Sequence, residues 1–157
     1  MAHARNAVYR HGELVALIWK LIRKNLFDPA DFVLAGSARL LRDAVIEHAS
    51  DLDVVARGAT FANALTLAHL PEHDGLTIGE NTGDKIAQLF GGRINVSARW
   101  LDREASIDDL IEGAEVLDGL RYFRIDDVIA YKTMLDRPKD RADLAALAES
   151  RCAAIGR

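Results

Sequence analysis

The sequence predicts an α/β fold, and three observations carry this prediction. Residues 11–27 place apolar side chains at spacings of three and four, as one face of an amphipathic helix does. Residues 32–35 form a short apolar run that ends at Gly36-Ser37, as a buried strand ends in a turn. Residues 51–55 read Asp-Leu-Asp-Val-Val, which has the two-residue period of a strand. Helical and strand patterns therefore alternate along the chain.

Length and composition limit the class of protein. The 157 residues suffice for a single domain, 1–157, with its own core. Half of the residues are hydrophobic and 28% are charged, as is typical of a soluble globular protein without a membrane segment. The N-terminus lacks the apolar core of a signal peptide, and the single Cys152 cannot form an internal disulfide, so we expect a cytoplasmic location. The net charge of −4 argues against broad binding to nucleic acid.

Six helices are predicted from periodicity and capping signals. They are expected over residues 11–27, 38–47, 61–70 and 106–113, beyond Asp126, and from Pro138 onward. The first of them, within the N-terminal segment 1–28, is expected to cover one face of a sheet. Side-chain oxygens suited to N-caps stand at Ser37, Thr60, Ser106 and Asp126.

The strands are predicted from alternation and turn chemistry. They are expected over residues 32–35, 51–55, 76–78 and 93–100, whereas 84–90 fits a short helix or an irregular strand. Residues 116–123 predict a hairpin around the two-residue turn Asp118-Gly119.

Asp51 and Asp53 are the first candidate site residues. Because they are two apart on a strand, they point to the same side and lie about 6–7 Å apart at the backbone. Two like charges side by side destabilise a strand unless a positive group lies there. The pair can therefore converge on one divalent cation.

The order strand, Gly36-Ser37, helix, Asp51-x-Asp53 resembles the nucleotidyltransferase superfamily. The resemblance implies one mixed, twisted sheet with helices packed mainly on one side. It implies that Gly36 lets the backbone approach a triphosphate, that Ser37 contacts phosphate, and that Asp51 and Asp53 are catalytic ligands of Mg²⁺. Two magnesium ions would be bound together with a nucleoside triphosphate, since magnesium takes carboxylate and phosphate oxygens. A Gly-Ser turn that opens a helix also presents N–H groups to an anion.

A second stretch, residues 127–147, is similar to the C-terminal part of small bacterial nucleotidyltransferases, including the abortive-infection toxin branch and minimal members. A helix lysine, Lys132, precedes the segment Arg-Pro-Lys-Asp-x-x-Asp-Leu. The resemblance implies a catalytic, phosphate-binding Lys132 and places Asp140 and Asp143 near the nucleotide. Without a site, the same segment would be the charged, solvated start of a helix with Asp140 as its N-cap.

The resemblance covers residues 32–148 and leaves 149–157 as a tail. Since lysine is rarely buried, the sequence predicts that Lys132→Ala lowers triphosphate affinity and leaves the melting temperature nearly unchanged.

One position departs from the family pattern. In the family a third carboxylate commonly lies on the strand after the D-x-D helix, and Asn95, between Ile94 and Val96, stands at the matching position. An asparagine oxygen can still bind a metal, but the side chain cannot act as a base. Metal activation, a substrate group, or Asp102 or Glu104 could take over that task.

Three classes of function are open at this point. The first, implied by the resemblance, is transfer of a nucleoside monophosphate from a nucleoside triphosphate to an acceptor hydroxyl, with release of pyrophosphate. The second, suggested by Asn95, is a catalytically weak nucleotide-binding module of a toxin–antitoxin or regulatory pair, with a partner protein or a second copy. The third is a plain interaction protein. The acceptor would be a protein hydroxyl, an antibiotic or an RNA end, and transfer RNA is the least favoured.

Overall fold

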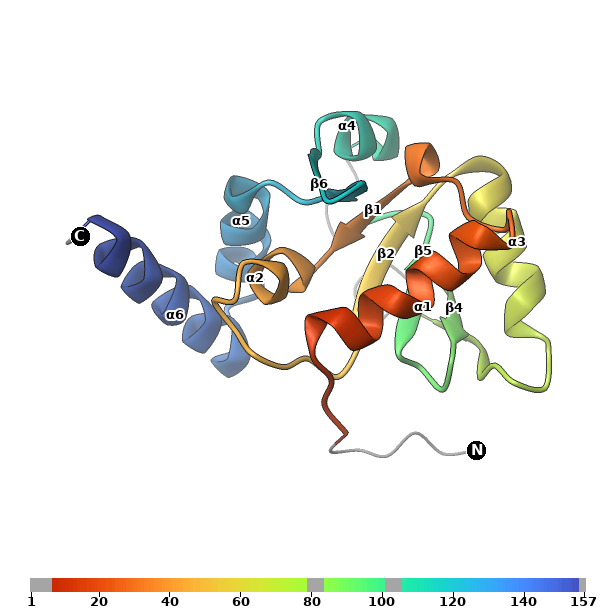
Figure 1. Cartoon of the computed structure of the whole chain (residues 1–157), viewed down its shortest axis with the longest axis horizontal. Coiled ribbons are helices and arrows are strands. Elements are labelled where there is room, and N and C mark those ends of the chain that lie inside the picture. The colour runs from red at the N-terminus through yellow and green to blue at the C-terminus, as the bar shows by residue number, and fades with distance from the viewer. Residues whose placement is uncertain (1–6, 79–83, 101–105, 156–157) are drawn as a thin grey trace.

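The computed structural model describes residues 7–78, 84–100 and 106–155. Seven strands form one sheet in the order β3-β4-β5-β2-β1-β7-β6. The strands are β1 (Phe32–Ala35), β2 (Leu52–Ala56), β3 (Gly75–Ile78), β4 (Lys85–Leu89), β5 (Ile94–Ser97), β6 (Glu115–Leu117) and β7 (Leu120–Tyr122). The helices are α1 (His11–Arg23), α2 (Ala38–Arg42), α3 (Gly58–Ala68), α4 (Ile107–Glu112), α5 (Ile125–Leu135) and α6 (Pro138–Ile155), with a 3₁₀ turn at Pro29–Asp31 (Figure 1).

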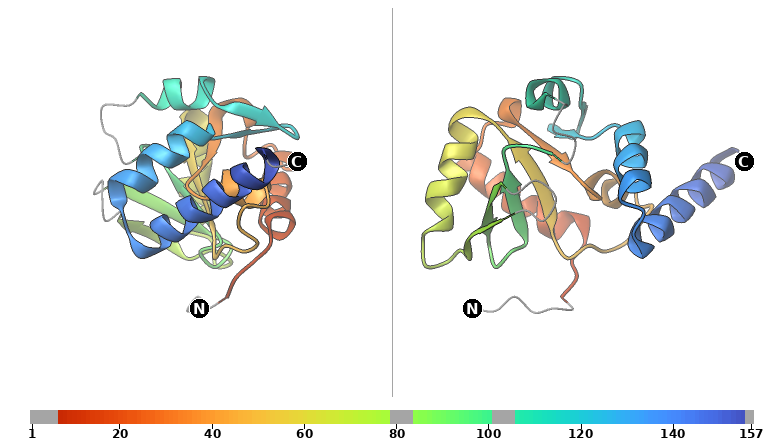
Figure 2. Two further views of the ribbon diagram at one scale, coloured as in Figure 1. Left: turned by 90° about the vertical axis from the view of Figure 1, so that its left-hand side faces the viewer. Right: turned by 180° about the vertical axis from the view of Figure 1, so that it is seen from behind.

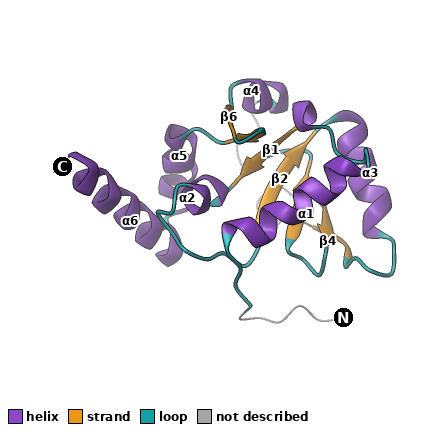
Figure 3. Ribbon diagram, viewed as in Figure 1, coloured by secondary structure: helices purple, strands orange, loops and turns teal. Residues whose placement is uncertain are grey.

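Strand β2 lies at the centre of the sheet and carries Asp53, while Asp51 directly precedes its first residue, so the strand predicted over 51–55 begins one residue later. It runs antiparallel to β1 and parallel to β5, so the sheet is mixed and the predicted α/β class is confirmed (Figure 3). In the register, Asp53 lies between Ala35 of β1 and Asn95 of β5. Ala35 at the end of β1, Asp53 and Asn95 are therefore neighbours across three adjacent strands.

One face of the sheet packs against α1 and α3; in Figure 1, α1 crosses in front of the strands and α3 lies at their right-hand edge. The helix α1 buries Leu14, Ile18 and Leu21 against this face, as the amphipathic pattern predicted. None of the described helices is long and apolar enough to cross a membrane.

The prediction that helices pack mainly on one side is wrong. The opposite face carries Val33, Ala35 and Val55, and these pack against Ile111 of α4, Val128 of α5 and Leu147 of α6. The reason lies in β1, whose four residues are all buried and so require cover on both faces. Seen from behind, the strands β4 and β5 stand in front of α1, and α5 and α6 lie beside them (Figure 2).

Several helix boundaries also differ from the prediction. The helix expected over 38–47 ends at Arg42, and Ala44 adopts a left-handed conformation that cannot continue it. Ser37 occupies the N-cap position of α2, but its side chain makes no capping hydrogen bond, and Asp126 lies inside α5. Ser106 accepts a hydrogen bond from the N–H of Asp109, as expected. Thr60 lies inside α3, where its buried hydroxyl accepts the N–H of Asp28.

The remaining elements follow the sequence closely. The ambiguous segment 84–90 forms β4, and β6 and β7 pair through the predicted turn with Leu117 opposite Leu120. The stretch 149–157, expected as a tail, is helical and exposed through Ile155. In α6, the apolar spacing of the sequence predicts that Leu144, Leu147 and Ala148 are buried; Leu147 is buried, Leu144 is half-buried and Ala148 is exposed.

Candidate active site

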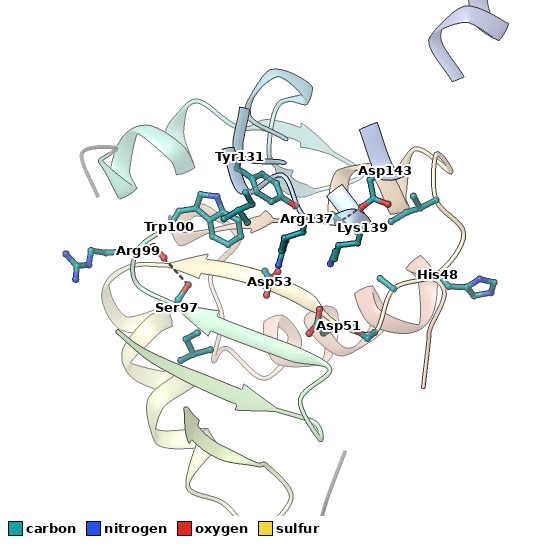
Figure 4. Close-up of a pocket in the computed structure, with 16 residues that line it drawn as sticks. His48, Asp51, Asp53, Ser97, Arg99, Trp100, Tyr131, Arg137, Lys139 and Asp143 are labelled. Atoms are coloured by element: carbon teal, nitrogen blue, oxygen red, sulfur yellow. Dashed lines mark hydrogen bonds between the residues drawn. The ribbon is translucent and has the colours of Figure 1, made fainter. Parts of the chain in front are cut away.

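A cleft of about 400 Å³ separates the polar part of the sheet face from α5 and the start of α6. Its walls include the sheet residues Asp53 and Ser97 below and Tyr131, Arg137 and Lys139 above (Figure 4). Side chains from four separate stretches of the chain thus meet around one opening. The volume falls within the range of small-ligand sites in proteins.

The two predicted carboxylates lie together on the floor of this cleft. Burial raises the pKa of Asp53 to about 7, and the negative charge of Asp51 contributes to the shift. Burial also raises the pKa of Asp51, against the charge of Lys139 and a hydrogen bond from Asn95. A pair that resists carrying two negative charges is stabilised by a bound cation.

Gly36 touches this acidic pair directly. Its φ is +61°, a conformation that residues with a Cβ rarely adopt, and an added Cβ would lie 2.7 Å from Asp53 Oδ2. The glycine of the Gly-Ser turn is therefore required by its contact with Asp53 as well as by its backbone conformation. A carboxylate packed so closely against the turn lies beside any group that the turn binds.

Gly36→Ala is expected to lower both stability and magnesium-dependent nucleotide binding. The matched control is Gly91→Ala, where φ is +68° and no atom lies within 4 Å of the added Cβ. The control should cost about 1–2 kcal/mol for the backbone conformation alone, whereas Gly36→Ala should cost about 1–3 kcal/mol more from overpacking. Thermal unfolding and calorimetry measure both effects. Equal losses of stability in the two variants, with nucleotide binding kept, would contradict the assigned contact.

Ser37, Lys132 and Asp143 form a network at the roof of the cleft. Lys132 Nζ donates to Ser37 Oγ at 2.9 Å and to Asp143 Oδ2 at 2.9 Å. Burial opposes the charged lysine, but its hydrogen bond to Asp143 and its contacts with Tyr131 raise its pKa above the ordinary value. The hydroxyl that was expected to contact phosphate is thus oriented by a lysine 95 residues away.

The expectation that Lys132 is exposed is wrong. Its side chain is 0% exposed, and it does not line the cleft. The signal was present in the sequence, because position 132 follows Val128 by one helical turn and so falls on the buried stripe of α5. Lys132 therefore supports the cleft from behind, and Asp143, which does line it, is the partner that faces the opening.

Asp140 is also fully buried, beside Lys132. Its oxygens accept hydrogen bonds from the Arg137 backbone and guanidinium and from Lys132 Nζ. Burial alone would raise the pKa of Asp140, but the bonds from Arg137 and the charge of Lys132 lower it to about 2. This carboxylate is accordingly held as an anion that fixes Arg137 at the mouth of the cleft.

Asn95 lies beside Asp51. Its Nδ2 donates to Asp51 Oδ2 at 3.0 Å and to the carbonyl oxygen of Gly92 at 3.1 Å. Two buried side-chain polar atoms lack a hydrogen-bond partner within the described part of the chain, and they are Asn95 Oδ1 and Trp100 Nε1. Asn95 contacts Asp51, and Trp100 lines the cleft, so both atoms belong to residues beside this site.

Arg137 and Lys139 supply positive charge opposite the acids. Both side chains point toward Asp53 and Asp51 in Figure 4, and their charges oppose the rise in the pKa of Asp53. The basic character of this segment is visible in the sequence, but its position above Asp51 and Asp53 is not.

Trp100 and Tyr131 also line the cleft, and no local pattern in the sequence distinguishes Trp100. His48 lies at the rim with its ring directed away from Asp53.

The donor set of the acidic pair fits magnesium. Within the described ranges, no three His, Cys, Asp or Glu side chains gather closely enough to form a metal cluster by themselves. Magnesium in nucleotide sites is commonly held by one or two carboxylates together with substrate phosphates. Asp51 and Asp53 supply such carboxylates in the cleft, and Asn95, which is hydrogen-bonded to Asp51, has a buried Oδ1 without a partner among the described residues. Asp102 and Glu104 lie outside the described residues.

Comparisons of the chain with protein-family models, curated proteins and solved structures found no match.

Proposed function

We propose that the protein binds a nucleoside triphosphate with magnesium in this cleft and transfers the nucleoside monophosphate to an acceptor hydroxyl. The observation that carries the proposal is the acidic pair, in which the pKa of Asp53 is raised to about 7, facing Arg137 and Lys139. Negatively charged side chains on one wall and positively charged side chains on the other suit a ligand that brings both a divalent cation and phosphate anions. The resemblance of the Gly-Ser turn, the D-x-D strand, the helix residue Lys132 and the Arg-Pro-Lys-Asp segment to nucleotidyltransferases agrees with this ligand.

The residues of the cleft would divide the work. Asp51 and Asp53 would hold magnesium, which when bound supplies charge neutralisation at the phosphates and activation of the acceptor oxygen. Arg137 and Lys139 would bind phosphate oxygens and stabilise the negative charge of the leaving pyrophosphate. Lys132 would keep Ser37 and Asp143 in position. The acceptor oxygen bonds to the α-phosphorus, the bond from that phosphorus to the bridging oxygen breaks, and the acceptor proton leaves to water.

A second candidate function is nucleotide binding with little turnover, and Asn95 favours it. Its amide occupies the place beside Asp51 where the family carries an acid. A general base typically contributes about 10²–10⁴-fold in rate, so a chain that lacks one could serve as a nucleotide-responsive partner in a toxin–antitoxin or regulatory pair.

Two measurements on the intact protein separate these functions. Calorimetry with each nucleoside triphosphate, with and without magnesium, tests binding. Incubation of nucleotides labelled at the α-phosphate with the protein and a cell extract tests transfer and shows whether a protein, a small molecule or RNA becomes labelled. Binding with transfer supports the first function, and binding without transfer supports the second. Absence of magnesium-dependent binding would reject both and leave an interaction protein.

Asn95→Asp tests the missing base directly. In the absence of metal the variant should be less stable than the wild type, because it replaces the hydrogen bond to Asp51 by a third negative charge. With magnesium and nucleotide, this loss should be recovered and pyrophosphate release should rise, by about tenfold or more if the base is restored. Melting curves with and without magnesium, and a pyrophosphate assay, check both parts. A wild type that is faster than the variant would show that the base lies elsewhere or is not needed.

A further inference from the structure

We infer that the end of the cleft formed by Trp100 and Tyr131 is the subsite for the nucleobase of the bound nucleotide. The inference rests on the proposed function and assigns the part of the nucleotide that the acidic pair and the cations do not contact.

The lining of the cleft changes from one end to the other. The acids and cations lie in its middle, and His48, Ala49 and Ser50 line one end. Trp100 and Tyr131 stand together toward the opposite end in Figure 4, away from Asp51 and His48. Ile86, on β4, and Leu135, one helical turn after Tyr131 on α5, also line the cleft. A ligand with a charged chain and a flat apolar group matches this change in character.

Trp100 is held firmly enough to form a stacking surface. Its ring makes edge-to-face contacts with Phe123 and with Tyr131, each with centroids 5.4 Å apart. Phe123 is buried in the core beneath α5, so the indole is anchored from behind while it lines the cleft in front. Nucleobases stack on such aromatic side chains whatever their identity.

Polar groups at the same end suit the edge of a base. Ser97 lines the cleft, and its hydroxyl donates to the carbonyl oxygen of Arg99 at 3.1 Å, so its own oxygen can still accept a hydrogen bond. The guanidinium of Arg99 is fixed by two hydrogen bonds to Asp84, at 2.8 and 2.6 Å, and is directed away from Asp53 in Figure 4, so it is not one of these groups. Flat apolar contact beside a few fixed polar atoms is how pockets recognise a base. The acceptor would then enter from the polar end at His48 and Ser50.

The chain has two tryptophans, Trp19 and Trp100, which allows a direct test. Trp19 packs with the core on the α1 side of the sheet, so Trp19→Phe leaves Trp100 as the single fluorophore without touching the cleft. With magnesium present, ATP, GTP, CTP and UTP should each change the Trp100 fluorescence, whereas inorganic triphosphate should not. In the unmodified protein, a nucleotide should bind at least about fivefold more tightly than inorganic triphosphate. This ratio corresponds to the smallest effect on affinity that the stacking of one base typically has.

Variants of Trp100 complete the test. Trp100→Leu should weaken nucleotide binding at least about fivefold and leave the affinity for inorganic triphosphate unchanged. Trp100→Phe keeps a flat ring and should therefore retain most of the affinity for nucleotide. If Trp100→Leu does not fold, the fluorescence and the affinity ratio decide alone. Equal affinity for nucleotide and inorganic triphosphate, or equal fluorescence changes, would overturn the base subsite and leave the phosphate site standing. Failure of both to bind would overturn the proposed function and the subsite with it.

Discussion

Lys132→Met should lower the free energy of unfolding by about 3–5 kcal/mol, the usual cost of removing one partner from a buried ion pair. Methionine keeps most of the lysine stem, so the change removes the ammonium group and leaves little cavity. Asp140 would remain 0% exposed without one of its cations, and Ser37 and Asp143 would each lose a 2.9 Å hydrogen bond. For a chain of this length, a loss of 3 kcal/mol lowers the melting temperature by on the order of 10 °C.

Lys139→Met is the matched control for this experiment. Lys139 is exposed at the start of α6 and faces the same cleft, so the variant should change stability by no more than about 0.5 kcal/mol while it weakens triphosphate binding. The double variant Lys132→Met with Asp140→Asn should be more stable than the sum of the two single losses predicts, because the two groups interact directly. Similar melting temperatures for Lys132→Met and Lys139→Met would show that the buried network contributes nothing to stability.

Asp53→Asn should have the opposite effect on stability and should abolish magnesium-dependent nucleotide binding. The folded-state pKa of Asp53, about 7, lies above the ordinary 3.8, so the folded protein holds this proton more tightly than the unfolded chain. The contribution of protonated Asp53 to the stability of the fold is therefore fully present below pH 4 and is lost as the pH rises through 7. Asparagine keeps the shape and never ionises, so at pH 8 the variant should be more stable than the wild type by about 2–4 kcal/mol.

The pH dependence distinguishes this effect from an ordinary change in packing. The gain of Asp53→Asn should be close to zero at pH 4 and should grow between pH 4 and 8, as followed by denaturant unfolding at several pH values. Asp74→Asn, at an exposed loop aspartate, should show no such growth. Magnesium should stabilise the wild type at pH 8 and leave the Asp53→Asn protein unchanged. A variant that is less stable than the wild type at every pH would mean that the carboxylate is satisfied without a cation.

The opposite signs expected for Lys132 and Asp53 separate two kinds of buried charge. Lys132 and Asp140 neutralise each other inside the protein and are expected to hold α5 and α6 to the turn after β1. Asp51 and Asp53 carry charges of the same sign, and the nearby charges of Lys139 and Arg137 oppose the rise in the pKa of Asp53 without preventing it. Two like charges that are held together at a cost to the stability of the fold are typical of a functional site.

Much of the fold was predictable from the sequence because its signals are local. The strands β1 and β2, the hairpin turn at Asp118-Gly119 and the buried stripe of α1 depend on side-chain period and turn chemistry within a few residues. The same period predicts that Asp51 and Asp53 point to one side, and both line the cleft, although Asp51 directly precedes β2. The length of α2 was not predictable, because it ends where Ala44 turns left-handed under tertiary packing.

The sequence by itself thus determined the element types and the shared face of the acidic pair. Only the tertiary structure decided which charges are buried and which face the cleft. Lys132 lies on a helix stripe that the sequence shows, but its burial depends on Asp140, Asp143 and Ser37 arriving from other elements to neutralise and bind it. The position of Trp100 against Phe123 and Tyr131 likewise depends on α5 packing over the sheet. The physical reason is that periodicity is set by neighbours along the chain, whereas the energy of a charge is set by its neighbours in space.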